Sequence, residues 1–167
     1  WIIGTADNPA EFDDVLPSNV PFFGLWDEAD GFEELSPERV KWPGTWLEED
    51  WGLAQPQLEM RRIFADVTAA RSKSCHGLIA KHWRTRALGA NTHALSRITW
   101  SRGTTSSPPT GELPMNRDAW IEEQYLDWAT RWFGPEAAAP ISQIFAELDK
   151  AGEDGDGALP RVLEWES

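Results

Sequence analysis

The sequence predicts an α/β fold with a parallel sheet, followed by a helical hairpin. Apolar segments of strand length alternate with amphipathic segments of helix length, which is the order of βα units with right-handed crossovers. Three of the apolar segments also run into polar or charged residues: Asp27-Glu28, Glu48-Glu49-Asp50 and His82-Trp83-Arg84. In a parallel sheet these residues would gather at one edge, which is the active face of an α/β barrel.

The first four expected elements precede the acidic run. Residues 1–5 predict the end of a strand, and a polar turn then leads into a short helix near 9–15. The run 20–26 is continuously apolar, which favours a buried parallel strand. Ser36-Pro37-Glu38 indicates either a helix cap or a turn into the next strand, 39–46.

Three further elements complete the first hundred residues. Apolar side chains at helical spacing predict a helix over 56–74, and 77–83 predicts a third strand. Asn91 is expected to cap a short helix that runs toward Trp100. Lys81 departs from the aliphatic pattern of a buried strand, so either it lies at the open strand end with its stem on apolar surface, or the strand register differs.

The composition changes at 101–114, a stretch rich in Gly, Ser, Thr and Pro that predicts a loop or linker. Beyond it, 116–133 and 135–149 predict two amphipathic helices that pack as a hairpin, broken at Gly134-Pro135. Pro140 predicts a late start or a kink in the second helix. The expected organisation is therefore 1–100 as the sheet-bearing part, 101–115 as the linker and 116–167 as the helical segment.

Charge and composition exclude several classes of protein. The net charge is −13, from 28 acidic and 15 basic residues among 167, and this repels nucleic acids and anionic membranes. No apolar run is long enough to span a bilayer, so we expect a soluble protein, with secretion or a periplasmic location left open. A start at Trp1 without a leader suggests a piece of a longer protein, and Cys75 alone does not reveal the redox compartment.

Tryptophan is unusually frequent in this chain. There are 11 tryptophans and one tyrosine, and many of the tryptophans lie near predicted strand ends and loops. A core that only needs volume would use Leu, Ile and Phe, whereas an indole offers a flat apolar face together with an N–H group. Carbohydrate is the commonest ligand that requires both properties, so the composition favours a carbohydrate ligand.

The acidic run after the strand 39–46 is the strongest candidate site. If the chain stays extended, Trp46, Glu48 and Asp50 share one side of the strand, and Leu47 and Glu49 share the other. Glycoside hydrolysis requires such a carboxyl pair, one group to protonate the leaving oxygen and one to attack or to activate water. The alternative is a solvated acidic run that caps the next helix.

Side chains at the other strand ends could complete this site. Asp27 and Glu28 follow Trp26 in the same pattern, although a turn cap explains them nearly as well. His82, beside Trp83, could orient a hydroxyl or assist proton transfer, or it could be a structural histidine. Arg84 and Arg86 could bind a substrate carboxylate or pair with the many acidic side chains, and the second role is slightly favoured.

No metal or cofactor is expected. His76 and His93 lack ligand spacing with Cys75 or His82, so no zinc site is predicted. The acidic residues 153–157 lack the ligand spacing and the terminal Glu of an EF-hand, and a solvated loop is expected there. The candidate site therefore rests on carboxylates, indoles and the groups at the strand ends.

Several motifs resemble those of (β/α)8-barrel glycoside hydrolases, in particular bacterial proteins related to the β-hexosaminidases and α-glucuronidases. The resemblance is carried by residues 46–50, 55–57, 77–86 and Asn91, and in the tail by 125–129, 133–138, 148–149 and 159–161. It implies a partial (β/α)8 barrel that contains the last strands, followed by helices. A whole barrel needs about 250 residues.

The sequence therefore predicts a glycoside hydrolase with Glu48, Asp50 and Glu49 as catalytic candidates. The substrate-binding candidates are Trp46, Trp26, Asp27, Glu28, His82, Trp83, Arg84 and Arg86. The expected partners are an oligo- or polysaccharide and the missing part of the barrel, with no nucleic acid, membrane or cofactor. Whether this part is active alone stays open, and the alternative is a non-catalytic carbohydrate-binding, structural or partner-binding α/β domain.

Overall fold

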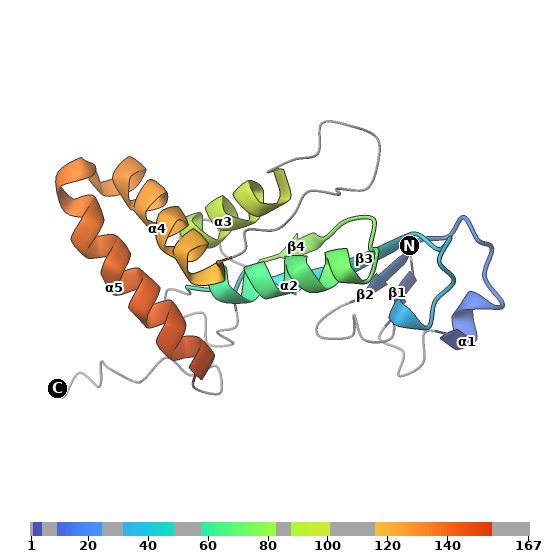
Figure 1. Cartoon of the computed structure of the whole chain (residues 1–167). Coiled ribbons are helices and arrows are strands. Elements are labelled where there is room, and N and C mark those ends of the chain that lie inside the picture. Colours follow the sequence, from blue (N-terminus) through green and yellow to red (C-terminus); the bar gives the residue numbers. More distant parts are fainter. Residues whose placement is uncertain are drawn as a thin grey trace, which may run out of the picture. The chain divides into compact units, whose positions relative to one another are not determined.

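The computed structural model describes residues 2–4, 10–24, 32–48, 58–82, 88–100 and 116–154 (Figure 1). Its elements, in chain order, are β1 (Ile2–Gly4), α1 (Ala10–Asp13), β2 (Phe22–Gly24), β3 (Lys41–Trp46), α2 (Met60–Ser72), β4 (Ile79–Lys81), α3 (Gly89–Trp100), α4 (Arg117–Phe133) and α5 (Pro135–Asp154). In this order α1 lies between β1 and β2, and α2 lies between β3 and β4, whereas β2 and β3 are consecutive and the last three elements are helices. The α/β class is therefore confirmed.

The strands form a four-stranded sheet in the order β1-β2-β3-β4, and every pair in it is parallel. Phe22 pairs with Lys41, and Gly44 pairs with Ile79. The predicted parallel sheet is confirmed, although β2 and β4 are shorter than the apolar runs that predicted them. Because all strands point the same way, their C-terminal ends lie at one edge of the sheet.

Alternating side chains give β3 two different faces. Lys41, Pro43 and Thr45 are buried, and Thr45 donates a hydrogen bond to Asp66 of α2, so this face packs toward the helix. Trp42 and Trp46 are half-buried on the opposite face. The sheet therefore presents its tryptophans on the side away from α2.

The described residues form two compact units. The first holds β1 to β4, α1 and α2 from Ala65 onward, and the second holds residues 47–48, 58–64, α3, α4 and α5. The predicted linker 101–115 lies outside the described residues. The predicted division of the chain at that linker therefore stays a prediction.

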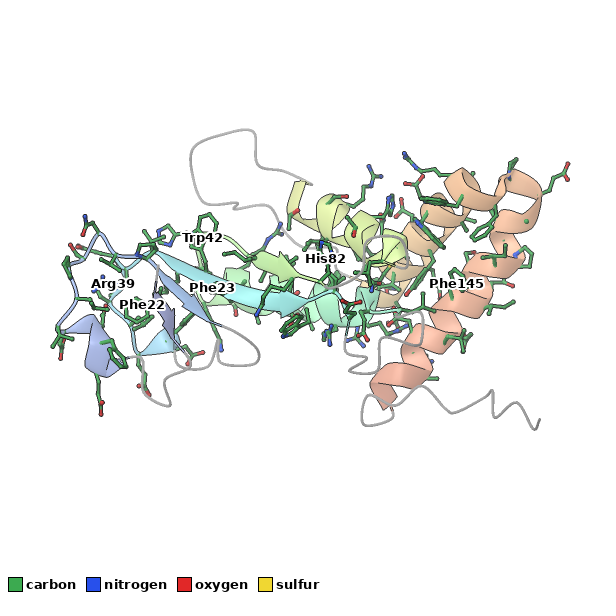
Figure 2. The ribbon with its side chains drawn as sticks, turned by 180° about the vertical axis from the view of Figure 1, so that it is seen from behind. Phe22, Phe23, Arg39, Trp42, His82 and Phe145 are labelled. Atoms are coloured by element: carbon green, nitrogen blue, oxygen red, sulfur yellow. The ribbon has the colours of Figure 1, made fainter. Side chains whose placement is uncertain are left out.

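Arg39 organises one end of the first unit. Its side chain is 3% exposed, and its guanidinium lies 5.2 Å from the centre of the Phe22 ring. Both side chains are labelled in Figure 2. The same group pairs with the Asp13 carboxylate and donates hydrogen bonds to the carbonyls of Asp13, Leu16, Pro17 and Val20. A planar group with five N–H donors can satisfy many carbonyls at once, so Arg39 holds the segment between α1 and β2.

The N-terminus of α2 is capped by side chains from distant helices of the second unit. Asn91 accepts a hydrogen bond from the Glu59 backbone N–H at 2.9 Å, and Asp149 accepts one from the Arg61 N–H at 3.2 Å. Both side chains are buried. The first N–H groups of a helix have no acceptor within the helix, so these side chains provide the acceptors for two of them.

The expectation that Asn91 caps α3 is wrong. That helix begins at Gly89, and Asn91 lies inside its first turn. Its side chain is fully buried, and besides accepting from Glu59 it donates to the carbonyl of Leu47 at 2.7 Å. Asn91 therefore joins α3 to the start of α2 and to the segment after β3.

The predicted helical hairpin is confirmed, because α4 and α5 pack along each other (Figure 1). Asn116 caps α4 by accepting from the Ala119 N–H, and Gly134 ends it with a positive φ of 83°. The helix α5 begins at Pro135, so the alternative of a late start is wrong, and Pro140 lies inside it. Within the described residues, no helix has the length and apolarity needed to cross a membrane.

Candidate functional site

The ends of β3 and β4 meet at one edge of the sheet. Trp46 and Lys81 are the last residues of the two strands, and they pair directly with each other. His82, which follows β4, is exposed and is labelled in Figure 2. Two of the predicted substrate-binding residues, Trp46 and His82, therefore belong to the C-terminal ends of adjacent parallel strands.

Glu48 lies two residues beyond the end of β3. Its side chain is only 3% exposed, and the preceding Leu47 is equally buried. The Leu47 carbonyl accepts the hydrogen bond from Asn91 described above, so α3 fixes the backbone next to this carboxylate. Glu48 is therefore a buried carboxylate on an anchored segment.

A lysine and two aromatic rings lie together on the tryptophan-bearing face of the sheet. The Lys81 Nζ atom is 4.3 Å from the centre of the Trp46 ring and 5.3 Å from the centre of the Phe23 ring. Both distances fall within the range of a cation–π interaction. Lys81 is the last residue of β4, as the first of the two explanations expected, but its Nζ atom is buried and does not reach solvent.

Gly44 makes room for this arrangement. A Cβ atom at Gly44 would lie 3.3 Å from the Lys81 Cε atom and 3.3 Å from the Phe23 ring. It would also lie 2.6 Å from the Gly24 carbonyl oxygen, which is closer than such atoms approach. The Lys81 stem and the Phe23 ring therefore both approach β3 where it has no side chain.

Most of the predicted site residues lie outside the described residues. These are Trp26, Asp27, Glu28, Glu49, Asp50, Trp83, Arg84 and Arg86. The pairing of Glu48 with Asp50 and the contribution of the strand end after β2 therefore remain predictions. Trp46, Glu48 and His82 are the predicted site residues that the structure describes.

The sequence marks Lys81 as unusual for a buried strand but predicts no role for it at the site. Its departure from the aliphatic strand pattern was the available signal, together with a glycine in the middle of β3. The contact itself depends on the register between β3 and β4 and on Phe23 from β2, and neither follows from the local sequence. Phe23 was likewise expected only as part of a buried strand.

A second polar cluster lies between α3 and α4. His93 Nε2 is 3.3 Å from the Asp127 carboxylate, and Asp127 also pairs with Arg131 at 3.2 Å. Burial is the main cause that lowers the pKa of His93, and the positive charges of Arg131 and Arg97 lower it further. The Asp127 carboxylate and a hydrogen bond with the Gln124 side chain raise this pKa, but the net shift is downward. His93 is therefore held mainly in its neutral form near neutral pH.

Within the part of the chain that the structure describes, no group of three or more His, Cys, Asp or Glu side chains has the arrangement of a metal site. Comparisons with protein-family models, with curated protein sequences and with solved structures find no match to this chain. The ends of β3 and β4 and their side chains are therefore the basis for assigning a function.

Proposed function

We propose that this chain is part of a carbohydrate-active enzyme, a glycoside hydrolase that uses Glu48 and Asp50 as its carboxyl pair. The observation that carries the proposal is the in-register pairing of Trp46 with Lys81 in parallel strands. It supports a common edge for the residues that end β3 and β4 and for His82, which follows β4. The half-buried Trp46 offers an indole surface at the same edge.

The proposed chemistry divides two roles between two carboxyl groups. One donates a proton to the glycosidic oxygen, and the other attacks the anomeric carbon or activates a water molecule, with Glu49 as the reserve candidate. Glu48 is one of the candidates for these roles, and its side chain is buried. Trp46, Trp26 and Trp83 would then stack on sugar rings, while His82 and the charged groups Asp27, Glu28, Arg84 and Arg86 bind hydroxyl or acidic substituents.

In this proposal the sheet represents the last strands of a (β/α)8 barrel. Residues 1–100 would supply the barrel part, 101–115 the linker and 116–167 the helical segment that follows it. The remaining strands would come from the missing part of the barrel, and the substrate would be an oligo- or polysaccharide. The parallel order of β1 to β4 supports this arrangement.

Hydrolysis by carboxylate variants tests the proposal. The chain is assayed on aryl glycosides and oligosaccharides, alone and joined to the remainder of its barrel. We expect Glu48→Gln and Asp50→Asn to lower turnover by about two to four orders of magnitude, the range for general acid–base groups. The matched control, Glu123→Gln, changes an exposed carboxylate on α4 and should leave turnover unchanged. Full turnover in both site variants would refute the assignment.

A non-catalytic domain is the alternative, and one observation favours it. Trp120 is 9% exposed and its ring lies 5.4 Å from that of Phe64, so at least one tryptophan serves the core of the second unit. Saturable quenching of tryptophan fluorescence by a glycan without hydrolysis would identify a binding module. A chain that ignores every glycan would be a structural or partner-binding domain.

A further inference from the structure

The Lys81 side chain is placed against two aromatic rings instead of extending into solvent. Its stem passes the backbone at Gly44, and its ammonium lies over Trp46 with Phe23 on the other side. All of these residues belong to the first unit, on the sheet face opposite α2. Phe23 is in register with Trp42 and lies near it in Figure 2, so aromatic side chains of two adjacent strands share the face that carries the lysine.

A lysine is an uncommon residue at a position where the side chain packs against aromatic rings. Removing an ammonium group from water is costly, and an apolar side chain of similar volume usually serves a core as well or better. The surrounding residues nevertheless accommodate the lysine, because a side chain at Gly44 would occupy the space of the stem. The arrangement therefore favours a role for Lys81 in the site at the ends of the strands.

We propose that Lys81 is the positioning residue that holds the Trp46 indole for stacking against a sugar ring. The ammonium occupies one face of the indole, so that a sugar can approach only the opposite face. An indole that is fixed in advance loses less conformational freedom on binding, which strengthens the interaction. This inference rests on the proposed carbohydrate function, and it adds a residue that acts through Trp46 without touching the substrate.

Substitutions of Lys81 test this role by glycan binding. Binding of xylotetraose, cellotetraose and chitotetraose is measured by calorimetry for the 167-residue chain. Lys81→Met, which keeps an unbranched stem but removes the charged end, should weaken binding of the glycan that the wild type binds by about tenfold, the scale of one cation–π contact. Lys81→Arg should restore most of the affinity, because a guanidinium also stacks on an indole.

Lys73→Met is the matched control. Lys73 follows α2 and pairs with Glu33 at 3.6 Å, and it belongs to the same unit. Its substitution should leave glycan affinity unchanged. If Lys81 served only stability, Lys81→Arg would not restore the affinity, and the loss of binding would follow the loss of thermal stability in both Lys81 variants.

The contact between Lys81 and Trp46 has a readout that does not need a ligand. Protons near the face of an aromatic ring are shielded, so the Lys81 Hε resonances should lie upfield of those of the other lysines in a ¹³C-labelled sample. Trp46→Leu should return them to the ordinary position. Resonances that Trp46→Leu leaves unmoved would overturn the inference.

The outcomes separate this inference from the proposed function. If the chain binds a glycan and Trp46→Leu weakens binding while Lys81→Met does not, the positioning role is wrong and the carbohydrate function stands. If neither the chain alone nor the chain joined to the remainder of its barrel binds any of the three glycans, the proposed function fails, and the inference fails with it. Weaker binding in Lys81→Met with rescue by Lys81→Arg supports both.

Discussion

Gly44 has no room for a side chain in the sheet. A methyl group there would lie 2.6 Å from the Gly24 carbonyl oxygen, which is backbone and cannot turn away. We therefore expect Gly44→Ala to lower the free energy of unfolding by about 1–3 kcal/mol, the usual cost of overpacking. Urea denaturation followed by circular dichroism measures the change.

A second glycine supplies the control for this prediction. Gly152 lies in α5, and a Cβ atom there would have no neighbour within 4 Å. Gly152→Ala should therefore stabilise the protein by about 0.5–1 kcal/mol, because alanine favours the helix. Equal effects of the two substitutions would show that the close contact at Gly44 has no energetic consequence.

At the residue scale, the sequence predicts the candidate site only in part. It identifies Trp46, Glu48 and His82 because these residues end apolar segments, which is a local signal. It does not predict the ring contacts of Lys81, because they require Phe23 of β2 and the pairing of β4 with β3. Contacts between strands depend on register, and register is set by the whole sheet.

At the scale of elements, side-chain periodicity predicts the helices and strands well. The two helices that end the described chain were expected within a few residues of their bounds, since their apolar faces and caps are local features. The error at Asn91 has a physical reason. A polar residue near a helix start normally caps that helix, but here its partners are 32 and 44 residues away along the chain. Such contacts leave no local signal.

Asp149 joins α5 to α2 and α4, and its removal should loosen this packing. Its carboxylate accepts hydrogen bonds from the Arg61 N–H at 3.2 Å and from the Tyr125 hydroxyl at 2.8 Å. Tyr125 is fully buried, and burial together with the Asp149 charge raises the pKa of its hydroxyl well above the usual value. Asp149→Ala leaves both donors without this acceptor, so we expect a loss of about 2–4 kcal/mol in urea denaturation.

Two variants provide stability losses to compare with that of Asp149→Ala. Asp149→Asn keeps an oxygen acceptor and should cost clearly less than the alanine variant. Asp118→Ala removes an exposed carboxylate that pairs with Arg61, and it should cost clearly less than Asp149→Ala because solvent screens an exposed pair. Hydrogen exchange at the Arg61 amide gives a local check, because exchange should accelerate in Asp149→Ala. An unchanged exchange rate at the Arg61 amide would contradict the role of Asp149 as the acceptor that caps α2.

The packing of α3 against α4 should weaken in acid because of His93. Burial is the largest cause of its lowered pKa, so the folded value lies below the ordinary value of 6.5. Protonation therefore favours the unfolded chain. The contribution of a neutral His93 to stability is complete above about pH 6.5 and declines as the pH falls through that value toward the lower folded pKa.

Thermal unfolding at several pH values tests this expectation. The melting temperature of the wild type should fall between pH 7.5 and 5, and His93→Gln, which cannot be protonated, should reduce that fall. Asp127→Asn removes the charge that opposes the shift, so it should increase the sensitivity to acid. A pH profile that His93→Gln leaves unchanged would assign the acid sensitivity to other groups.

At the scale of the whole molecule, the net charge and the sheet edges have opposite effects on self-association. The described sheet ends at β1 on one side and at β4 on the other, and unpaired strand edges favour association with further strands. The net charge of −13 opposes any approach of two copies. Salt screens this repulsion, since the Debye length falls from about 30 Å at 0.01 M to about 3 Å at 1 M ionic strength.

The chain should therefore associate more strongly as salt rises. Sedimentation velocity in sodium chloride should give a monomer at about 0.01 M and larger species at about 1 M. If the β4 edge takes part, hydrogen exchange at the amides of Ile79, Ala80 and Lys81 should slow under the associating condition. Association without slower exchange there would exclude this edge as the contact. Association that is stronger at low salt would show that attraction between opposite charges outweighs the repulsion expected from the net charge.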